Sequence, residues 1–394
     1  MSASATQRTT PQPPAAPSER IAALDVLRGV AILGTLATNI WIFTDPGGFL
    51  GYLLEDTAST TPAGWAAVEA LLQQLSQGKF LGLLTLLFGI GLEIQRRSAL
   101  RAGRRWPGRY TVRAALLFLD GVVHYLLVVE FDVLMGYAVT GAVVAYLLAT
   151  SERAQRAWML AAAGVHVLLL GLGTAALTAA PAPPAPGGIE PNPYADGSWW
   201  DLVLLRVDAA VLFRIEPVFI QALSVALFLL GARLLRAGAL APVGAALRRR
   251  LLVVGTVALP VDLALGVFGG PAGLVLARYG TAPLVALGLL ALVVEVVGRR
   301  ERPGAVGRRL AEVGRMALSG YVLQNVVASA LCYGWGLGLA SRLDPAVRVP
   351  ATVALYVVVV AVVVAFAHLW LRRFARGPVE WLWNASYRAL TRAR

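Results

Sequence analysis

Hydrophobic residues in this chain gather in long runs that are separated by short polar segments. A helix needs about twenty apolar residues to cross a bilayer, and it satisfies its own backbone hydrogen bonds while doing so. By that measure the chain has about ten candidate spans, at residues 21–43, 79–95, 110–129, 132–149, 157–179, 214–235, 251–268, 281–298, 316–338 and 350–371. The pattern predicts an all-α fold, a polytopic transmembrane helix bundle.

Positive charge is unevenly distributed among the segments that join these spans. If the N-terminus is cytoplasmic, the outer segments contain few of the 35 lysine and arginine residues, namely Lys79, Arg206, Arg214, Arg278, Arg342 and Arg348. The other basic residues fall in inner segments or at the inner ends of spans. Because cytoplasmic loops carry the excess of Lys and Arg, we expect both termini to be cytoplasmic and the protein to lie in the plasma membrane.

Composition supports a membrane protein and excludes some other classes. The 394 residues are 58% hydrophobic and only 14% charged, which is more apolar than a soluble domain requires. The basic residues that give the net charge of +13 lie mostly in the predicted cytoplasmic segments, so this charge does not indicate a nucleic-acid partner. A single cysteine, Cys332, cannot form an internal disulfide.

The two ends of the chain differ from the bundle. Residues 1–19 are rich in Ser, Thr, Pro and Ala, which predicts a disordered cytoplasmic tail. Residues 20–375 form the predicted bundle, and residues 376–394 are predicted to be a cytoplasmic amphipathic basic tail. Between the first two spans, a stretch from Thr61 with apolar residues at helical spacing predicts a helix that lies on the outer surface and could roof a pocket.

The first predicted span carries polar residues at both ends. Asp25 and Arg28 are three residues apart and can pair on one helix face, and Asn39 follows about three turns later. Ionisable groups inside a span cost about 2.5–3.5 kcal/mol each on insertion scales, so those that remain generally have a partner or line a polar cavity. Two interpretations are open: a salt bridge that anchors the helix end, or a helix that faces a polar interior and binds substrate.

The third and fourth spans provide the best candidate for catalysis. Asp120 and His124 are four residues apart on one helix face, and a very short outer turn brings Asp132 back toward them, with Tyr137 deeper in the returning helix. A carboxylate beside an imidazole fixes its tautomer, as a general base that removes a hydroxyl proton requires. The alternative is a buried histidine that only satisfies its own hydrogen bonds.

The ninth span adds hydrogen-bonding side chains that indicate a surface facing the bundle interior. We expect these residues to bind substrate: Arg315, Tyr321, Gln324 and Asn325. The three histidines and one cysteine have no zinc spacing, and no nucleotide-binding motif is present, so no metal site is predicted.

Several segments together resemble one known family. "LDVLRGVAILGTLATNI", "GKFLGLLTLLFGIG", "GVVHYLLVVEFDVLMGYAVTG", "GRMALSGYVLQN" followed by "YGWGLGL", and "GPVEWLW" occur in the order typical of YeiB-like membrane proteins, the family of the domain of unknown function 418. The matches run from residue 21 to about 383, and the resemblance implies a family C-terminal domain at about 215–390. Asn384 departs from the pattern, because the family often has an arginine there.

A more distant resemblance links "LDVLRG" to membrane acyltransferases that modify glycans and other acceptors outside the cytoplasm. Many of those proteins have a histidine fourteen residues after the aspartate, where this chain has Asn39, so His124 would have to be the base. The resemblance implies acyl transfer from acyl-CoA or a similar thioester to a hydroxyl on a small molecule, glycan or lipid-linked acceptor. A transporter or flippase is the alternative, and a membrane scaffold or sensor is a third.

Overall fold

The computed structural model describes residues 22–54, 61–179, 191–299 and 304–392, and within these ranges the chain is helical without a strand. The helices are α1 Ala22–Phe43, α2 Gly48–Leu54, α3 Ala63–Ser76, α4 Lys79–Arg101, α5 Tyr110–Leu127, α6 Leu134–Leu147, α7 Glu152–Ala179, α8 Trp199–Asp208, α9 Ala210–Phe219, α10 Gln221–Arg236, α11 Ala245–Phe268, α12 Gly270–Leu276, α13 Ala282–Gly298, α14 Ala305–Arg315, α15 Ala317–Cys332, α16 Leu339–Arg342, α17 Arg348–Leu371 and α18 Pro378–Arg392. Pro242–Gly244 form a 3-10 turn, and Ala277–Thr281 form a π-helical turn. The predicted all-α fold is confirmed, whereas the predicted tail at 1–19 lies outside the described residues.

Seven helical segments of the described chain are long and apolar enough to cross a membrane: Ala22–Phe43, Ala63–Arg101, Tyr110–Leu127, Glu152–Ala179, Pro242–Phe268, Gly270–Gly298 and Arg348–Leu371. If the α9–α10 pair, which is bent by 42°, is counted as one further span, the described chain has up to eight candidate spans. Each of the ten predicted spans coincides with a helix. However, α6 has 14 residues and α15 has 16, less than the roughly twenty that cross a bilayer. The count of about ten is therefore not confirmed.

The bend between α9 and α10 follows from the sequence at their junction. Pro217 lies inside α9, where its ring removes one backbone hydrogen bond and crowds the preceding turn. The helix consequently ends at Phe219, and a new one begins at Gln221. This break exposes the end of α9 to the bundle interior.

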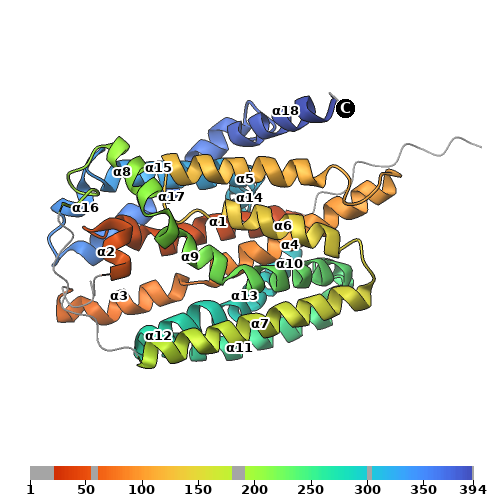
Figure 1. Ribbon diagram of the computed structural model, residues 1–394, viewed down its shortest axis with the longest axis horizontal. Coiled ribbons are helices and arrows are strands. Elements are labelled where there is room, and N and C mark those ends of the chain that lie inside the picture. The colour runs from red at the N-terminus through yellow and green to blue at the C-terminus, as the bar shows by residue number, and fades with distance from the viewer. Residues whose placement is uncertain (1–21, 55–60, 180–190, 300–303, 393–394) are drawn as a thin grey trace, which may run out of the picture.

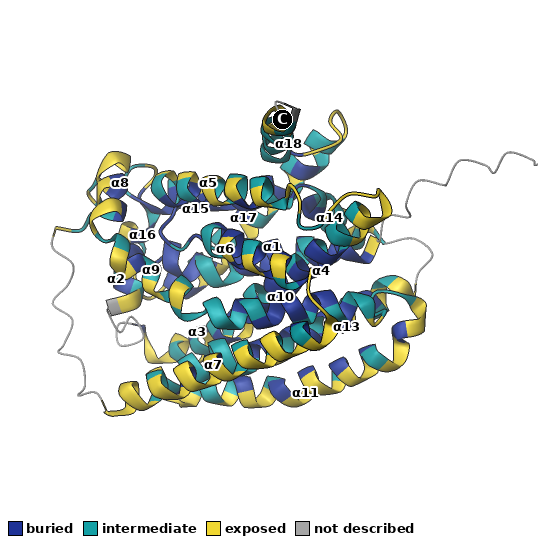
Figure 2. Cartoon of the chain, turned by 45° about the vertical axis from the view of Figure 1, so that its right-hand side comes forward, coloured by how far each residue is buried: buried dark blue, intermediate teal, exposed yellow. Residues whose placement is uncertain are grey.

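The core of the bundle is built around α1 and α4. In both of their candidate spans 72% of the residues in the apolar window are buried, whereas the value is 11% for α7 and 17% for the span that contains α11. Figure 1 shows most of the long helices running along the long axis, and Figure 2 shows exposed residues concentrated on α7 and α11. A helix on the outside of a membrane bundle contacts lipid instead of water, so apolar residues on its exposed face are expected.

The segment predicted to lie on the outer surface is helical. Helix α3 leads into α4 in one stretch from Ala63 to Arg101 that runs along the bundle (Figure 1). The break between them lies at Gly78, whose φ of 75° is left-handed. A side chain at Gly78 would also meet the backbone oxygen of Arg278, so glycine allows the close approach of the two segments. The apolar side chains of Trp65, Leu71 and Leu75 are exposed, and the position of α3 on the outer surface stays a prediction.

The C-terminal helix α18 lies outside the bundle, against α5 and α15 (Figure 1). Its Glu380 carboxylate accepts hydrogen bonds from the backbone N–H groups of Leu318 at 2.8 Å and Ser319 at 3.2 Å, and from the Ser319 hydroxyl. These are free donors at the start of α15, where a negative charge also complements the helix dipole. On the other side, Arg113 of α5 stacks on Tyr387, with its guanidinium carbon 4.6 Å from the ring centre.

We expect the substitution Glu380→Ala to loosen α18 from the bundle. Loss of a helix-capping side chain costs about 0.5–2 kcal/mol, so amide hydrogen exchange in α18 and in the first turn of α15 should accelerate. Hydrogen exchange measured by mass spectrometry on the full-length protein checks this, with Glu380→Gln as the control that keeps an acceptor oxygen. Unchanged exchange in Glu380→Ala would mean that other contacts hold α18.

Candidate functional site

One cavity of the described structure has a volume of about 830 Å³ and lies beside the C-terminal half of α1. On α1 its wall begins at Thr35 and includes Asn39, and other parts of the wall come from α2, α3, α6, α9, α12 and α15. We call this end of the bundle the Asn39 end, and the opposite end the Arg28 end. The polar side chains in the wall include Asn39, Gln73, Gln77, Asp132, Tyr137, Glu216, Gln221, Arg278, Tyr279 and Tyr321.

A buried histidine stands behind the Asp132 part of this wall. The Nδ1 atom of His124 lies 3.0 Å from Oδ1 of Asp132, and Nε2 lies 3.1 Å from the side-chain nitrogen of Asn325. With the Asn325 amide in this orientation, it donates to Nε2, so the imidazole proton lies on Nδ1 and is donated to Asp132. His124 itself does not line the cavity. Asp132, whose side chain is itself fully buried, is therefore the member of the His124–Asp132 dyad that lies in the cavity wall.

The α5–α6 hairpin brings the dyad together for local reasons. Helix α5 ends at Leu127, and Asp132 stands just before α6, where its Oδ2 accepts a hydrogen bond from the backbone N–H of Met135 at 3.0 Å. The carboxylate thus satisfies a free donor at the start of α6. A side chain at Gly121 would come within 2.6 Å of the Met135 nitrogen and 3.0 Å of Asp132, so glycine permits the close contact of the two helices.

Helix α15 closes the dyad from the other side. The Tyr321 ring packs against the imidazole of His124 with ring centres 4.7 Å apart, and Tyr321 also lines the cavity. One turn further on, the Gln324 side chain donates to the Thr35 hydroxyl at 3.4 Å, which links α15 to α1. The polar face of α15 thus orients His124 with Asn325 and presents Tyr321 to the cavity.

Two arginines hold the segment between His124 and Asp132 in place. Arg206 of α8 pairs with Glu130 at 3.2 Å, and both side chains are fully buried. Its guanidinium also donates to the carbonyl oxygens of Leu126 at 2.9 Å and Val128 at 3.0 Å, which are free acceptors at the end of α5. Arg214 of α9 donates to the backbone oxygens of Glu130 and Asp132. The α5–α6 connection is therefore rigidly clamped.

Comparison with known proteins gives relatives over nearly the whole chain. The family described as "Protein of unknown function (DUF418)" matches residues 234–389. The Bacillus subtilis (strain 168) protein named "Uncharacterized protein YxaH" is 28% identical over 397 residues, which cover 95% of each chain. The Escherichia coli (strain K12) protein named "Uncharacterized protein YeiB" is 31% identical over 398 residues, which cover 93% of this chain and 96% of that protein. This chain belongs to the YeiB-like DUF418 family.

Some residues of the segments that carry the YeiB-like resemblance line the cavity. Asn39, Asp132, Tyr137 and Tyr321 all line it, and the Tyr137 hydroxyl is held by the Thr85 hydroxyl at 2.7 Å. Asn325 and Gln324 lie just behind the wall through their contacts with His124 and Thr35. These predicted residues, which come from three helices and the α5–α6 connection, therefore form one site in the YeiB-like fold.

Other predicted residues lie elsewhere. Asp25 and Arg28 pair with each other at 3.6 Å, on the part of α1 that precedes the cavity wall. Arg315 ends α14, and a side chain at neighbouring Gly314 would clash with the backbone oxygen of Asp25. This trio therefore occupies the Arg28 end of the YeiB-like bundle. A single chamber for all the predicted polar residues is not present.

Asp120 is the predicted catalytic residue with the least direct contact with the dyad. It lies one turn before His124 on α5, yet the partner of His124 Nδ1 is Asp132. Asp120 is half-buried, and its Oδ2 is buried without a hydrogen-bond partner among the described residues. Neither Asp120 nor His124 lines the cavity, so Asp132 is the one predicted catalytic residue that does.

Sequence analysis missed several polar residues of the cavity. The carboxylate of Glu216 pairs with Arg278 at 2.6 Å and accepts a hydrogen bond from the Tyr279 hydroxyl at 2.8 Å. Arg278 also donates to Gln77 at 2.8 Å. Glu216 follows an alternating charge pattern that is equally typical of an interfacial helix, and Arg278 stands alone in an apolar run. Only the packing of α9 against the turn before α13 reveals their connection.

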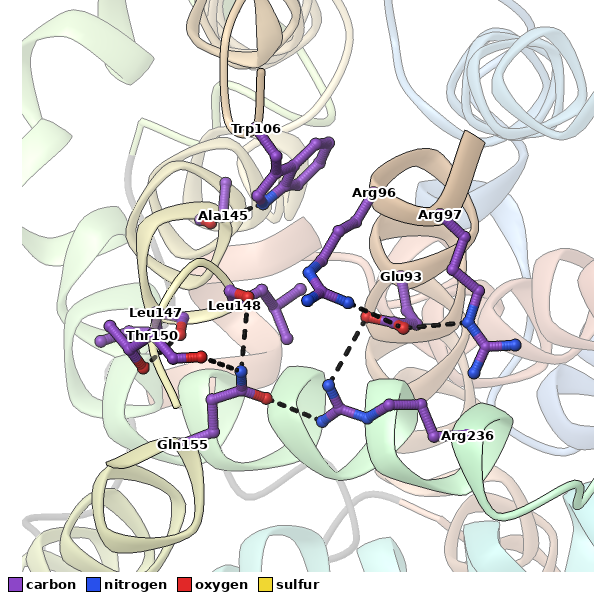
Figure 3. A network of polar contacts seen from close by, with 10 residues as sticks. All are labelled: Glu93, Arg96, Arg97, Trp106, Ala145, Leu147, Leu148, Thr150, Gln155 and Arg236. Atoms are coloured by element: carbon purple, nitrogen blue, oxygen red, sulfur yellow. Dashed lines mark hydrogen bonds and ion pairs between the residues drawn. The ribbon is translucent and has the colours of Figure 1, made fainter. Parts of the chain in front are cut away.

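A second polar network lies toward the C-terminal end of α4 (Figure 3). The buried carboxylate of Glu93 pairs with Arg97 at 3.0 Å, Arg96 at 3.4 Å and Arg236 at 3.7 Å. Arg236 also donates to the Gln155 side chain at 2.8 Å. None of these residues lines the cavity. Because Glu93 contacts arginines of α4 and α10, and Arg236 contacts Gln155 of α7, the network is best explained as a link between these three helices.

Proposed function

We propose that the protein is a plasma-membrane protein with about ten spans and both termini in the cytoplasm. The coincidence of each predicted apolar run with a helix supports this count, provided that the bent α9–α10 pair and the short helices α6 and α15 also cross the bilayer. In this topology the Arg28 end faces the cytoplasm and the cavity lies near the outer surface. The asymmetric distribution of basic residues supports the orientation.

For the activity, we infer acyl transfer from a thioester to a hydroxyl group bound in the cavity. The single observation that supports it is the buried His124–Asp132 dyad, in which Asp132 belongs to the cavity wall and the imidazole is held between Asp132 and Asn325. A buried pair of titratable groups beside a cavity of enzyme-site size is an arrangement that can accept a proton.

In the proposed reaction the acceptor hydroxyl gives its proton to the dyad at Asp132 as its oxygen attacks the acyl carbonyl carbon. The new C–O ester bond forms, the C–S bond breaks, and the thiolate leaves with the proton that the dyad returns. Tyr321 also lines the cavity, and its hydroxyl is the group we assign to donate to the developing oxyanion. Asn325 and the Met135 N–H keep the dyad oriented.

The donor would approach from the Arg28 end. Arg28 and Arg315 are candidates to hold the phosphates of acyl-CoA or a similar thioester, since arginine binds phosphate through paired donors. From Arg28 to the first wall residue on α1, Thr35, the helix rises about 10 Å. The thioester arm would have to pass along α1 over this distance, because the cavity wall on α1 begins only at Thr35.

The activity can be tested in sealed vesicles that contain the full-length protein, a membrane lipid extract and acetyl-CoA labelled in the acetyl group. We expect free thiol to be released and label to appear in a base-labile ester in equal amounts, above the level in vesicles that lack the protein. Thiol release that equals the blank, with acyl-CoA of several chain lengths, would contradict the proposal.

Transport of a small molecule or a lipid-linked substrate is the second candidate. The observation in its favour is that the cavity lies at one end of the bundle and its wall on α1 includes no residue before Thr35. A transporter in one state of its cycle would have such a one-sided cavity. In the vesicle assay transport would move a solute chemically unchanged, without the release of thiol.

A further inference from the structure

We propose that the 830 Å³ cavity binds one membrane lipid with an uncharged, hydroxyl-bearing head group, which enters sideways from the bilayer. The proposal concerns binding alone and does not depend on acyl transfer. It rests on three properties of the cavity: an apolar rim, a polar interior, and wall charges that are already paired.

The rim of the cavity is apolar and faces outward. The lining residues with exposed side chains are all apolar, and they come from α2, α7, α9 and α12: Leu53, Leu177, Ile215, Pro271 and Leu274. Ile215 is 58% exposed, and the α7 surface beside Leu177 is among the least buried in the bundle. Because these helices present their apolar faces to lipid, an opening between them admits an acyl chain rather than a water-soluble molecule.

The opening lies near one surface of the membrane. Leu177 is two residues from the end of α7, a helix of 28 residues that is about 42 Å long and thus longer than the hydrocarbon core. Leu53 likewise lies in the last turn of α2. A lipid at this level has its head group beside the opening, so the head group can move inward while the chains stay among the outer helices.

The interior offers hydrogen bonds of the kind that bind hydroxyl groups. Amide side chains from three helices line it, namely Asn39, Gln73 and Gln221. No hydrogen bond holds the half-buried Asn39 side chain among the described residues, so its amide can bind a ligand. Hydroxyl groups of a ligand both donate to and accept from amide side chains.

The charges in the wall argue against a phosphate head group. Asp132 pairs with His124, Glu69 with Arg348 at 3.6 Å, and Glu216 with Arg278 at 2.6 Å. Among the described lining residues Arg278 is the one cation, and its carboxylate partner lies in the same wall. An anionic head group would therefore meet three carboxylates and no unpaired cation. An uncharged head group is not repelled by these carboxylates.

The test is native mass spectrometry of the full-length protein released from phosphatidylcholine nanodiscs, with no acyl donor present. The nanodiscs contain either monoglucosyl diacylglycerol or phosphatidylglycerol as the minor lipid. We expect one retained glucosyl lipid per chain and no specific retention of phosphatidylglycerol. Preferential retention of phosphatidylglycerol, or no retained glucosyl lipid, would overturn the proposal whatever the result of the acyl-transfer assay.

Two variants locate the lipid. Leu177→Trp narrows the rim and should lower retention of the glucosyl lipid by about tenfold. Leu168→Trp is the matched control on the same helix, because Leu168 is 61% exposed but does not line the cavity. Asn39→Leu removes one hydrogen bond in the interior and should lower retention about fivefold. Equal retention by Leu177→Trp and Leu168→Trp would mean that the lipid binds elsewhere.

Discussion

Replacement of His124 by alanine should lower acyl transfer at least about 100-fold, because removal of a positioned acid–base group typically costs 10²–10⁴ in rate. His124 contacts Asp132, Asn325 and Tyr321, so the loss of the imidazole removes the group that shares the proton with the cavity wall. The measurement is the release of thiol from acetyl-CoA in vesicles matched for the amount of folded protein. Asp132→Asn should have a comparable effect, since an amide cannot accept the proton.

His368→Ala provides the matched control for this prediction. His368 is a partly exposed histidine near the end of α17 that contacts Glu312 at 3.3 Å, and it does not line the cavity. Its loss should leave the rate within about twofold of the wild type, as expected for a group outside the site. If His124→Ala kept the wild-type rate while the wild type was active, the dyad would have no part in the chemistry.

Arg206→Met should produce the largest loss of stability in the chain, about 3–5 kcal/mol, because it leaves the buried carboxylate of Glu130 without its partner. The methionine also cannot donate to the carbonyl oxygens of Leu126 and Val128. We expect the free energy of unfolding, measured by titration with dodecyl sulfate in mixed micelles, to fall by this amount. The Asp132 side of the cavity should loosen as well.

Two comparisons separate the buried ion pair from the general loss of an arginine. Arg299→Met is the control, since the side chain of Arg299 is 75% exposed, and its stability should equal that of the wild type. The double variant Glu130→Leu with Arg206→Met should be more stable than Arg206→Met alone, because no unpaired charge remains. A double variant less stable than the single one would show that Glu130 contributes through other contacts.

Local spacing in the sequence was sufficient to predict much of the site. The Asp25–Arg28 pair follows from a separation of three residues on a helix, and its predicted contact is present at 3.6 Å. The short connection after α5 predicted that Asp132 returns to His124, and the two side chains meet at 3.0 Å. Both predictions depend on neighbours in the chain, where geometry leaves few alternatives.

Contacts between distant segments could not be predicted in this way. Asn325 lies 201 residues from His124, and the Glu216–Arg278 pair joins residues that are 62 apart. Asp120 and His124 share a helix face, yet the better placed carboxylate is that of Asp132, in the connection that precedes the next helix. The relative packing of α5, α6, α9 and α15 decides these contacts, and hydrophobic periodicity does not specify it.

The span count illustrates the same limit. Apolar runs predicted where helices form, and Pro217 accounts for the bend between α9 and α10, but the lengths of α6 and α15 depend on tertiary packing. Similarly, the stretch after Thr61 has the apolar spacing of a surface helix, although it continues into α4 and lines the cavity. The spacing of apolar residues defines an apolar helix face, whereas the surface against which that face packs depends on the fold.

The most direct test of the central claim, that Asp132 presents the dyad to a bound hydroxyl, is a cryo-electron microscopy map of the full-length protein in nanodiscs with monoglucosyl diacylglycerol. The account predicts ordered density in the cavity, with a head-group oxygen within hydrogen-bond distance of the Asp132 carboxylate and acyl chains that leave past Leu177. An empty cavity, or a head group that stays outside the rim while Asp132 contacts only protein atoms, would contradict it.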